Sequence, residues 1–279
     1  MNKSSNNFSN KIILGTANFG TKYGHFNNQI DIKQHDRIIK YLKSNKITSL
    51  DWSFDYPNSF TTIQKYFLRK INIDSKLSIN SLNKDLNFLN SNKIKFNTIY
   101  IRSPEILDSS SFYYLFEIIN KLKEFKIIKR IGYSIYDINL LEKKNYPKPD
   151  VLQIPINIFD QRFLKTKYNN KYYKKNTTIV ARSIFLQGKL FRSPDKYISK
   201  IENTHYTKFY NFLRLNNISA MSFIKSFYAS VHTIDKIILG ISDLKNLKDF
   251  VNSNYKIYNL KTFNAFSTNN KQIIDPRKW

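Results

Sequence analysis

Short apolar runs and longer amphipathic segments follow one another along the whole chain. The runs are rich in Ile and Val, as strands buried on both faces are, and the segments between them carry apolar residues at helical spacing. In the segment 112–125, apolar residues recur at i, i+3, i+4 and i+7. The pattern predicts strands at 12–14, 49–52, 75–79, 98–102, 130–134, 151–156, 178–183 and 236–240, and helices that include 33–44, 61–70, 112–125 and 244–252.

Eight strand candidates, each followed by a helix or a long loop, predict an α/β fold of one particular kind, the (β/α)₈ TIM barrel. An open doubly wound sheet is the alternative, but it usually has fewer units. No internal repeat or Pro/Gly-rich linker divides the chain. We therefore expect a polar N-terminal tail at residues 1–10 and a single barrel domain at residues 11–279.

The net charge of +26, from 46 Lys+Arg and 20 Asp+Glu, would ordinarily point to nucleic acid or an anionic surface. However, the basic residues are spread evenly, and only nine of them are Arg, the residue favoured for bidentate phosphate and base contacts. This distribution fits AT-rich coding better than a polyanion-binding surface, which stays as the weaker alternative. We expect no nucleic-acid partner.

Other compositional features exclude whole classes of chemistry. The absence of Cys rules out disulfides, iron–sulfur clusters and thiol nucleophiles. The four histidines are isolated and form no HExxH motif, so no metal site is predicted. The N-terminal ten residues lack the apolar region of a signal peptide, and no run approaches the ~18 apolar residues of a membrane span. The expectation is a cytoplasmic protein without a membrane partner.

Only six glycines are present, and most of them follow strand candidates, where barrel enzymes place their chemistry. The stretch from Gly15 to Lys22 nearly reads as a P-loop, but Thr21 and Lys22 stand in the reverse order and no helix follows. A GxGxxG motif is also missing, so a Rossmann dinucleotide site is not supported.

Three residues near the second and third strands suggest proton chemistry. Lys76 lies inside a strand, where an unpaired ammonium would be costly, and Asp51 on the adjacent strand could supply its partner. Tyr56 follows in the loop after Asp51, and a Tyr beside a Lys has its pKa lowered from about 10. The alternative is a buried salt bridge with a Tyr that only packs nearby.

The sequence resembles the aldo-keto reductases from Lys11 to Phe250, most closely a bacterial branch of that family. The resemblance rests on the order and spacing of several segments. These are LGTANFGTKYG at 14–24, IGYSIY at 131–136, LQIPINIFDQR at 152–162, ARSIFLQG at 181–188 and IILGISDL at 237–244. The family is a (β/α)₈ barrel that binds NADP(H) without a Rossmann domain, so the resemblance implies the same for this chain.

The resemblance also implies catalytic residues. Asp51, Tyr56 and Lys76 match three members of the family's Asp-Tyr-Lys-His tetrad, and Arg102 stands where the family carries the His. The implied reaction is hydride transfer between the cofactor and a small-molecule carbonyl or alcohol, for which a sugar intermediate is one guess, with Tyr56 as proton donor. A catalytically weakened or retired barrel that acts as a binding protein is the alternative, because the tetrad is incomplete. The oligomeric state is left open.

For the cofactor, the resemblance implies NADPH, with NADH as the alternative. Ser134, Gln153 and, more loosely, Asn157 match residues that hold the nicotinamide carboxamide, and Arg182 stands where many members stack a Tyr on the nicotinamide. The phosphate end lacks the usual Arg or Lys for the 2′-phosphate, and Asp243 would repel that group. The full implied cofactor set is Thr16, Ser134, Gln153, Asn157, Arg182, Ser183, Phe185, Gly188, Gly240, Ser242 and Asn246.

Overall fold

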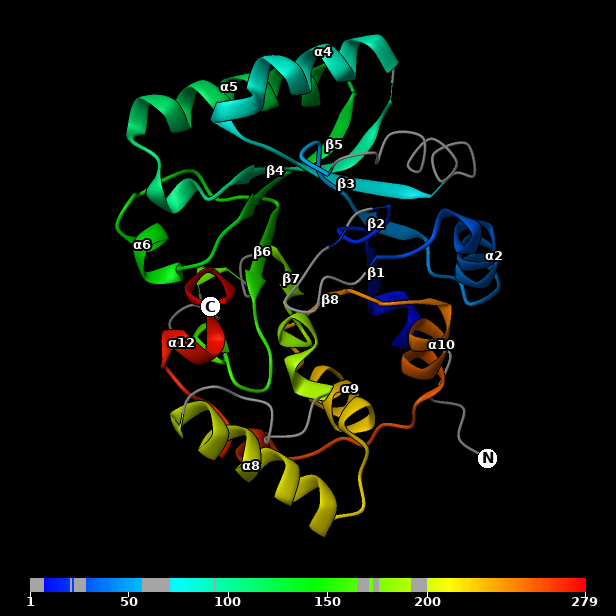
Figure 1. Cartoon of the computed structure of the whole chain (residues 1–279). Helices are drawn as coiled ribbons and strands as arrows, with labels where there is room; N and C mark the ends of the chain where they lie inside the picture. Colours follow the sequence, from blue (N-terminus) through cyan, green and yellow to red (C-terminus); the bar gives the residue numbers. More distant parts are fainter. Residues whose placement is uncertain are drawn as a thin grey trace.

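A computed structural model describes residues 8–20, 22, 29–56, 71–92, 94–164, 171–172, 176–191 and 200–279. The predicted helix at 61–70 lies outside the described residues. Within them, eight parallel strands close into a barrel in sequence order, with β8 paired to β1 (Figure 1). The strands are β1 (Ile12–Gly15), β2 (Ser49–Asp51), β3 (Asn72–Leu77), β4 (Phe96–Arg102), β5 (Ile128–Ser134), β6 (Val151–Pro155), β7 (Thr178–Arg182) and β8 (Lys236–Leu239).

The closed barrel confirms the prediction of a (β/α)₈ fold and excludes the open sheet. All eight predicted strands are present, most with ends within a few residues of the predicted ones. The prediction for the third strand was wrong at both ends, because β3 begins at Asn72, paired in register with Ser49, and ends at Leu77.

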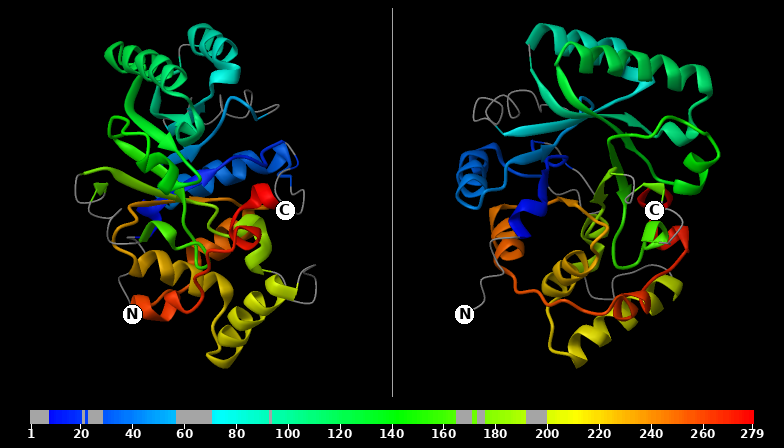
Figure 2. Two further views of the ribbon diagram at one scale, coloured as in Figure 1. Left: turned by 90° about the vertical axis from the view of Figure 1, so that its left-hand side faces the viewer. Right: turned by 180° about the vertical axis from the view of Figure 1, so that it is seen from behind.

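Helices surround the barrel, and α4 and α5 lie side by side against one part of it (Figures 1 and 2). The helix predicted at 244–252 has the predicted bounds, whereas α5 begins earlier than expected because Asp108 caps it by accepting from the Ser111 N–H. No helix in the described ranges is both long enough and apolar enough to cross a membrane. The α-helices are α2 (His35–Ser44), α4 (Leu82–Asn92), α5 (Ser109–Glu124), α6 (Ile138–Glu142), α8 (Lys200–Leu215), α9 (Ala220–Ser230), α10 (Leu244–Asn252), α11 (Leu260–Asn264) and α12 (Lys271–Ile274).

Short 3₁₀ segments form several of the loops around the mouth of the barrel. Two matter for the site, η4 (Pro104–Ile106) after β4 and η7 (Leu186–Phe191) after β7. Another, η9 (Pro276–Lys278), is the last element before the final residue, Trp279. At the other end, Phe8 packs against Phe250 and Tyr255, with ring centres 6.1 and 5.4 Å away.

The interior of the barrel has an apolar layer that lies directly beneath the site. Its members, separate from the larger core between strands and helices, are Ile13, Tyr100, Val151, Val180 and Ile238. Side chains that are two positions apart along a strand point to the same face. Two positions after each member of this layer, the chain has a residue that lines one cavity. These five residues are Gly15, Arg102, Gln153, Arg182 and Gly240. The alternation within the barrel therefore brings these positions together.

Gly132 on β5 makes room for the ring of Tyr100, its partner on β4. A Cβ at position 132 would lie 2.3 Å from the nearest ring carbon of Tyr100, which is fully buried. We expect Gly132→Ala to lower the free energy of unfolding by about 1–3 kcal/mol, the usual cost of overpacking. Urea unfolding of Gly132→Ala, Tyr100→Leu and the double variant checks this. The double variant should lose less stability than the two single losses added together, and full additivity would contradict the proposed clash.

Candidate active site

A cavity of about 700 Å³ opens at the carboxyl ends of the barrel strands. In (β/α)₈ enzymes the active site is at this end. Of the predicted catalytic residues, Asp51, Tyr56, Lys76 and Arg102 all line it. Of the predicted cofactor residues, Ser134, Gln153, Arg182, Ser183, Phe185, Gly188, Gly240, Ser242 and Asn246 line it as well. The structure therefore brings together residues from strands that are far apart in the sequence.

A buried ion pair lies at the centre of this arrangement. Lys76 Nζ is 2.6 Å from Asp51 Oδ1, and the two side chains are only 10% and 8% exposed. Burial lowers the pKa of Lys76, with Arg102 and Arg182 adding to the lowering and Asp51 acting in the opposite direction. The sequence-based expectation of an acidic partner for Lys76 is met by Asp51.

Asp51 is also held by a second hydrogen bond. Gln153 Nε2 donates to Asp51 Oδ1 at 2.8 Å, and Ser134 Oγ donates to Gln153 Oε1 at the same distance. Gln153 is completely buried. Its carboxamide thus connects the ion pair on β2 and β3 to the end of β5, and both of its ends are occupied by the protein itself.

Arg102, the last residue of β4, reaches the turn that follows β2. Its Nη2 donates to Ser53 Oγ at 2.7 Å and lies 2.6 Å from Asp55 Oδ2. The turn is closed by the Tyr56 N–H, which donates to the Ser53 carbonyl at 3.1 Å. Arg102 is therefore bonded on both sides of residue 54 and directly before Tyr56.

Arg182, the last residue of β7, is fixed against the loop that follows β5. Its Nη2 donates to the Ile135 carbonyl at 2.9 Å, and its guanidinium carbon lies 3.8 Å from the centre of the Tyr136 ring. The guanidinium carbon of Arg277, on η9, lies 3.7 Å from the same centre. Tyr136 itself lines the cavity. The Tyr136 ring is thus contacted both by Arg182 in the wall of the cavity and by Arg277 near the end of the chain.

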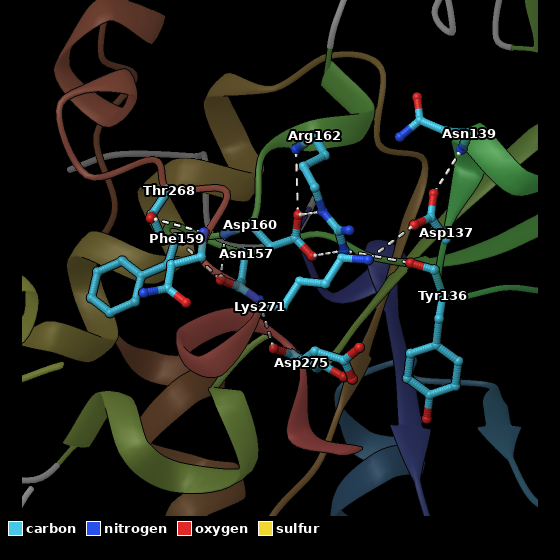
Figure 3. A network of polar contacts seen from close by, with 12 residues as sticks. Tyr136, Asp137, Asn139, Asn157, Phe159, Asp160, Arg162, Thr268, Lys271 and Asp275 are labelled. Atoms are coloured by element: carbon cyan, nitrogen blue, oxygen red, sulfur yellow. Dashed lines mark hydrogen bonds and ion pairs between the residues drawn. The ribbon is translucent and has the colours of Figure 1, made fainter. Parts of the chain in front are cut away.

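The Tyr136 backbone is held by further charged side chains, part of which Figure 3 shows. Its N–H donates to Glu105 Oε1 at 2.8 Å, and its carbonyl accepts from Arg162 Nη2 at 3.4 Å. Arg162 in turn makes two 2.8 Å bonds to the carboxylate of Asp160. Burial raises the pKa of Glu105. The loop is therefore held in a defined position.

The ends of β7 and β8 form the other side of the cavity with their backbones. Ser183 and Gly188 have positive φ angles of 57° and 93° in the tight loop that leads into and through η7. A Cβ built on Gly240 would meet no atom within 4 Å. Beyond Gly240, Asp243 caps α10 by accepting from the Asn246 N–H. This side of the cavity leaves open space where a ligand can approach the backbone.

Two of the predicted cofactor residues do not line the cavity. Thr16 is buried, and its Oγ1 donates to the Asp51 carbonyl at 2.9 Å. Asn157 is fully buried, and its Oδ1 accepts from the N–H groups of Phe159 and Asp160 at 2.9 Å. Both lie behind the wall, where Thr16 holds the end of β2 and Asn157 shapes the loop after β6.

The sequence-based reading missed several residues of the site. Asp55 and Ser53 lie in the same segment as Tyr56 but had no signal of their own, since their partner is on β4. Tyr136 belongs to the segment 131–136 that carried the resemblance, so it could have been found there. Asn18 also lines the cavity and donates through Nδ2 to the Ile241 carbonyl. Within the described ranges, no cluster of His, Asp and Glu is arranged to hold a metal ion.

The barrel superposes on solved aldo-keto reductases, which confirms the fold that the sequence resemblance implied. The holo form of AKR11C1 from Bacillus halodurans superposes with a TM-score of 0.69 at 13% identity, covering 92% of this chain and 90% of that one. The glycerol dehydrogenase AKR11B4 from Gluconobacter oxydans gives 0.66 at 13% identity, with coverages of 95% and 92%.

A eukaryotic enzyme shares the fold as well. The aldo-keto reductase AKR2E5 of the silkworm, Bombyx mori, gives a TM-score of 0.64 at 14% identity, with coverages of 92% and 84%. AKR2E5 has also been solved in complex with NADPH. No protein-family model matches the present sequence, and no curated protein matches it. The likeness is therefore one of fold.

Proposed function

We propose that this protein is an oxidoreductase of the aldo-keto reductase type, which reduces a small-molecule carbonyl compound with NADPH or NADH. The observation that carries the proposal is the buried Lys76–Asp51 pair, which lines the same cavity as Tyr56 at the carboxyl ends of the barrel strands. A phenol and a buried ammonium together are suited to deliver a proton to a developing alkoxide.

In this proposal each residue of the chain has one task. Tyr56 donates its hydroxyl proton to the carbonyl oxygen of the substrate. Lys76 stabilises the phenolate that remains, and Asp51 keeps Lys76 charged and in place at 2.6 Å. Gln153, with both ends of its amide occupied, holds Asp51 and Ser134 in register. Solvent then returns a proton to Tyr56.

The residues of the cavity fit a reduced nicotinamide cofactor. Bound there, it would supply a hydride to the carbonyl carbon and leave oxidised, while the substrate becomes the alcohol. Space is open beside Gly240, and the chain turns sharply at Gly188, which has a positive φ. Together they form a binding groove that is lined by backbone groups. We assign Ser134 and Arg182 to the nicotinamide half, Ser183, Phe185 and Gly188 to the pyrophosphate, and Gly240, Ser242 and Asn246 to the adenosine half. Thr16 and Asn157 support these groups from behind the wall.

A larger side chain at position 240 tests the assignment of this groove to the cofactor. We expect Gly240→Leu to weaken NADPH or NADH binding by at least tenfold, because the new side chain enters space that is open in the protein. The fold should tolerate it, so the melting temperature should stay close to that of the parent. Binding is measured by the quenching of tryptophan fluorescence, with Trp52 and Trp279 as reporters.

The activity itself is tested by the oxidation of NADPH and NADH with a panel of aldehydes, ketones and sugars. Turnover with any of them supports the reductase. Cofactor binding without turnover would favour the alternative of a retired barrel that binds nicotinamide. Absence of binding for both cofactors would contradict the proposal altogether.

A further inference from the structure

The geometry points to Arg102 as a positioning residue for Tyr56: its guanidinium holds the turn that carries Tyr56, instead of contacting the substrate. The inference rests on the proposed role of Tyr56 as proton donor. Arg102 stands at the position where the aldo-keto reductases carry the His of their tetrad, so the inference assigns a different role to that position.

A single nitrogen makes the connection. Arg102 Nη2 donates to Ser53 Oγ at 2.7 Å and lies 2.6 Å from Asp55 Oδ2. These two acceptors belong to the turn of residues 53–56, which the Tyr56 N–H closes onto the Ser53 carbonyl at 3.1 Å. Because β3 lies between β2 and β4 in the barrel, the side chain joins two parts of the mouth that share no strand pairing.

The charge of Arg102 is paired within the same turn, and it also lowers the pKa of the neighbouring Lys76. Asp55 neutralises the guanidinium, and its backbone leads directly into Tyr56. Arg102 Nε is buried without a hydrogen-bond partner among the described residues, so the side chain is oriented by its Nη2 contacts. The two side chains of the pair are 37% and 43% exposed, and such pairs add little to global stability. We therefore assign to the Arg102–Asp55 pair the role of holding the turn of residues 53–56 in place.

Position matters because proton donors act over hydrogen-bond distances. A displacement of about 1 Å can lower a catalysed rate by about 10²-fold. An anchored turn keeps Tyr56 in the wall of the cavity that Lys76 and Asp51 also line. Loss of the anchor should thus lower kcat and leave cofactor affinity unchanged.

The test is a double-mutant cycle of Arg102→Met and Asp55→Asn, made in a Trp279→Phe background so that Trp52 is the only tryptophan. Trp52 directly precedes the turn and is 2% exposed, packed against Phe54 with ring centres 4.8 Å apart. We expect each single variant to increase acrylamide quenching of Trp52 and to lower kcat by about ten- to hundredfold. The double variant should be no worse than Arg102→Met alone, because that change already removes the contacts to both Ser53 and Asp55.

Arg102→Lys serves as the conservative variant and should recover part of both losses, since an ammonium can still pair with Asp55. Two results would overturn the inference: additive effects of the two variants on kcat, or Asp55→Asn with the parent's quenching and kcat. Either would mean that the Arg102–Asp55 pair does not position Tyr56. If no carbonyl compound is turned over, the proposed function fails, while the quenching cycle still decides whether Arg102 anchors the turn.

Discussion

Tyr56→Phe should lower kcat for carbonyl reduction by about 10²–10⁴-fold, the usual contribution of a positioned general acid. The variant removes one hydroxyl and keeps the ring, which packs against the core. Affinity for NADPH or NADH should be unchanged, because the residues assigned to the cofactor lie on the ends of β5, β7 and β8 and in the loops that follow. A lower kcat with unchanged cofactor affinity is the result expected if Tyr56 is the proton donor.

The measurement is single-turnover oxidation of the reduced cofactor at saturating substrate, together with fluorescence titration of cofactor binding. Tyr113→Phe is the matched control: Tyr113 lies on α5, is 45% exposed and is absent from the lining of the cavity. It should retain the parent's rate. A Tyr56→Phe variant with the parent's kcat would remove Tyr56 from the reaction.

The barrel could be predicted because its strands carry a local signal. Each is a short Ile- or Val-rich run, and burial on both faces requires this composition. The ends of the strands depend on partners elsewhere. β3 begins at Asn72 because that residue pairs with Ser49, a contact that no local pattern contains.

Of the residues at the mouth of the barrel, Asp51 was predicted from its place beside Lys76, whereas Arg102, Ser134 and Arg182 were identified through the resemblance. Each of the four ends a strand, and the ends of parallel strands meet at one face. The direction of a loop side chain has no such periodicity. Asn157 therefore matched the resemblance by position, but its side chain bonds to the backbone of its own loop and to the Ser183 carbonyl.

Apart from the Lys76–Asp51 pair, the contacts between distant segments of the site were not predicted from the sequence. Arg102 and Asp55 come from the end of β4 and the turn after β2, and Gln153 and Asp51 are 102 residues apart. Arg102 reaches Asp55 across β3, whereas Gln153 on β6 and Asp51 on β2 meet across the closed barrel. For this reason Arg102 could be identified by sequence as unusual, while its partner could not.

Lys76→Met is expected to have the largest combined effect, on stability and on activity. The variant leaves the carboxylate of Asp51 buried without its cation, and breaking a buried pair in this way costs about 3–5 kcal/mol. Gln153 still donates to Asp51, but a neutral amide replaces only part of the lost interaction. Reduction should fall to background as well, since Lys76 stabilises the phenolate of Tyr56 in the proposed reaction. Urea unfolding and the cofactor-oxidation assay measure the two effects.

The variant Lys76→Met/Asp51→Asn separates stability from chemistry. With both charges removed, the Asn side chain can still accept from Gln153, and replacement of a buried pair by neutral groups is often close to neutral in stability. We therefore expect most of the free energy of unfolding to return while the activity stays lost. Recovery of turnover in the double variant would show that the pair only packs the end of the barrel, the alternative that the sequence left open. A single variant as stable as the parent would show that the 2.6 Å contact carries little energy.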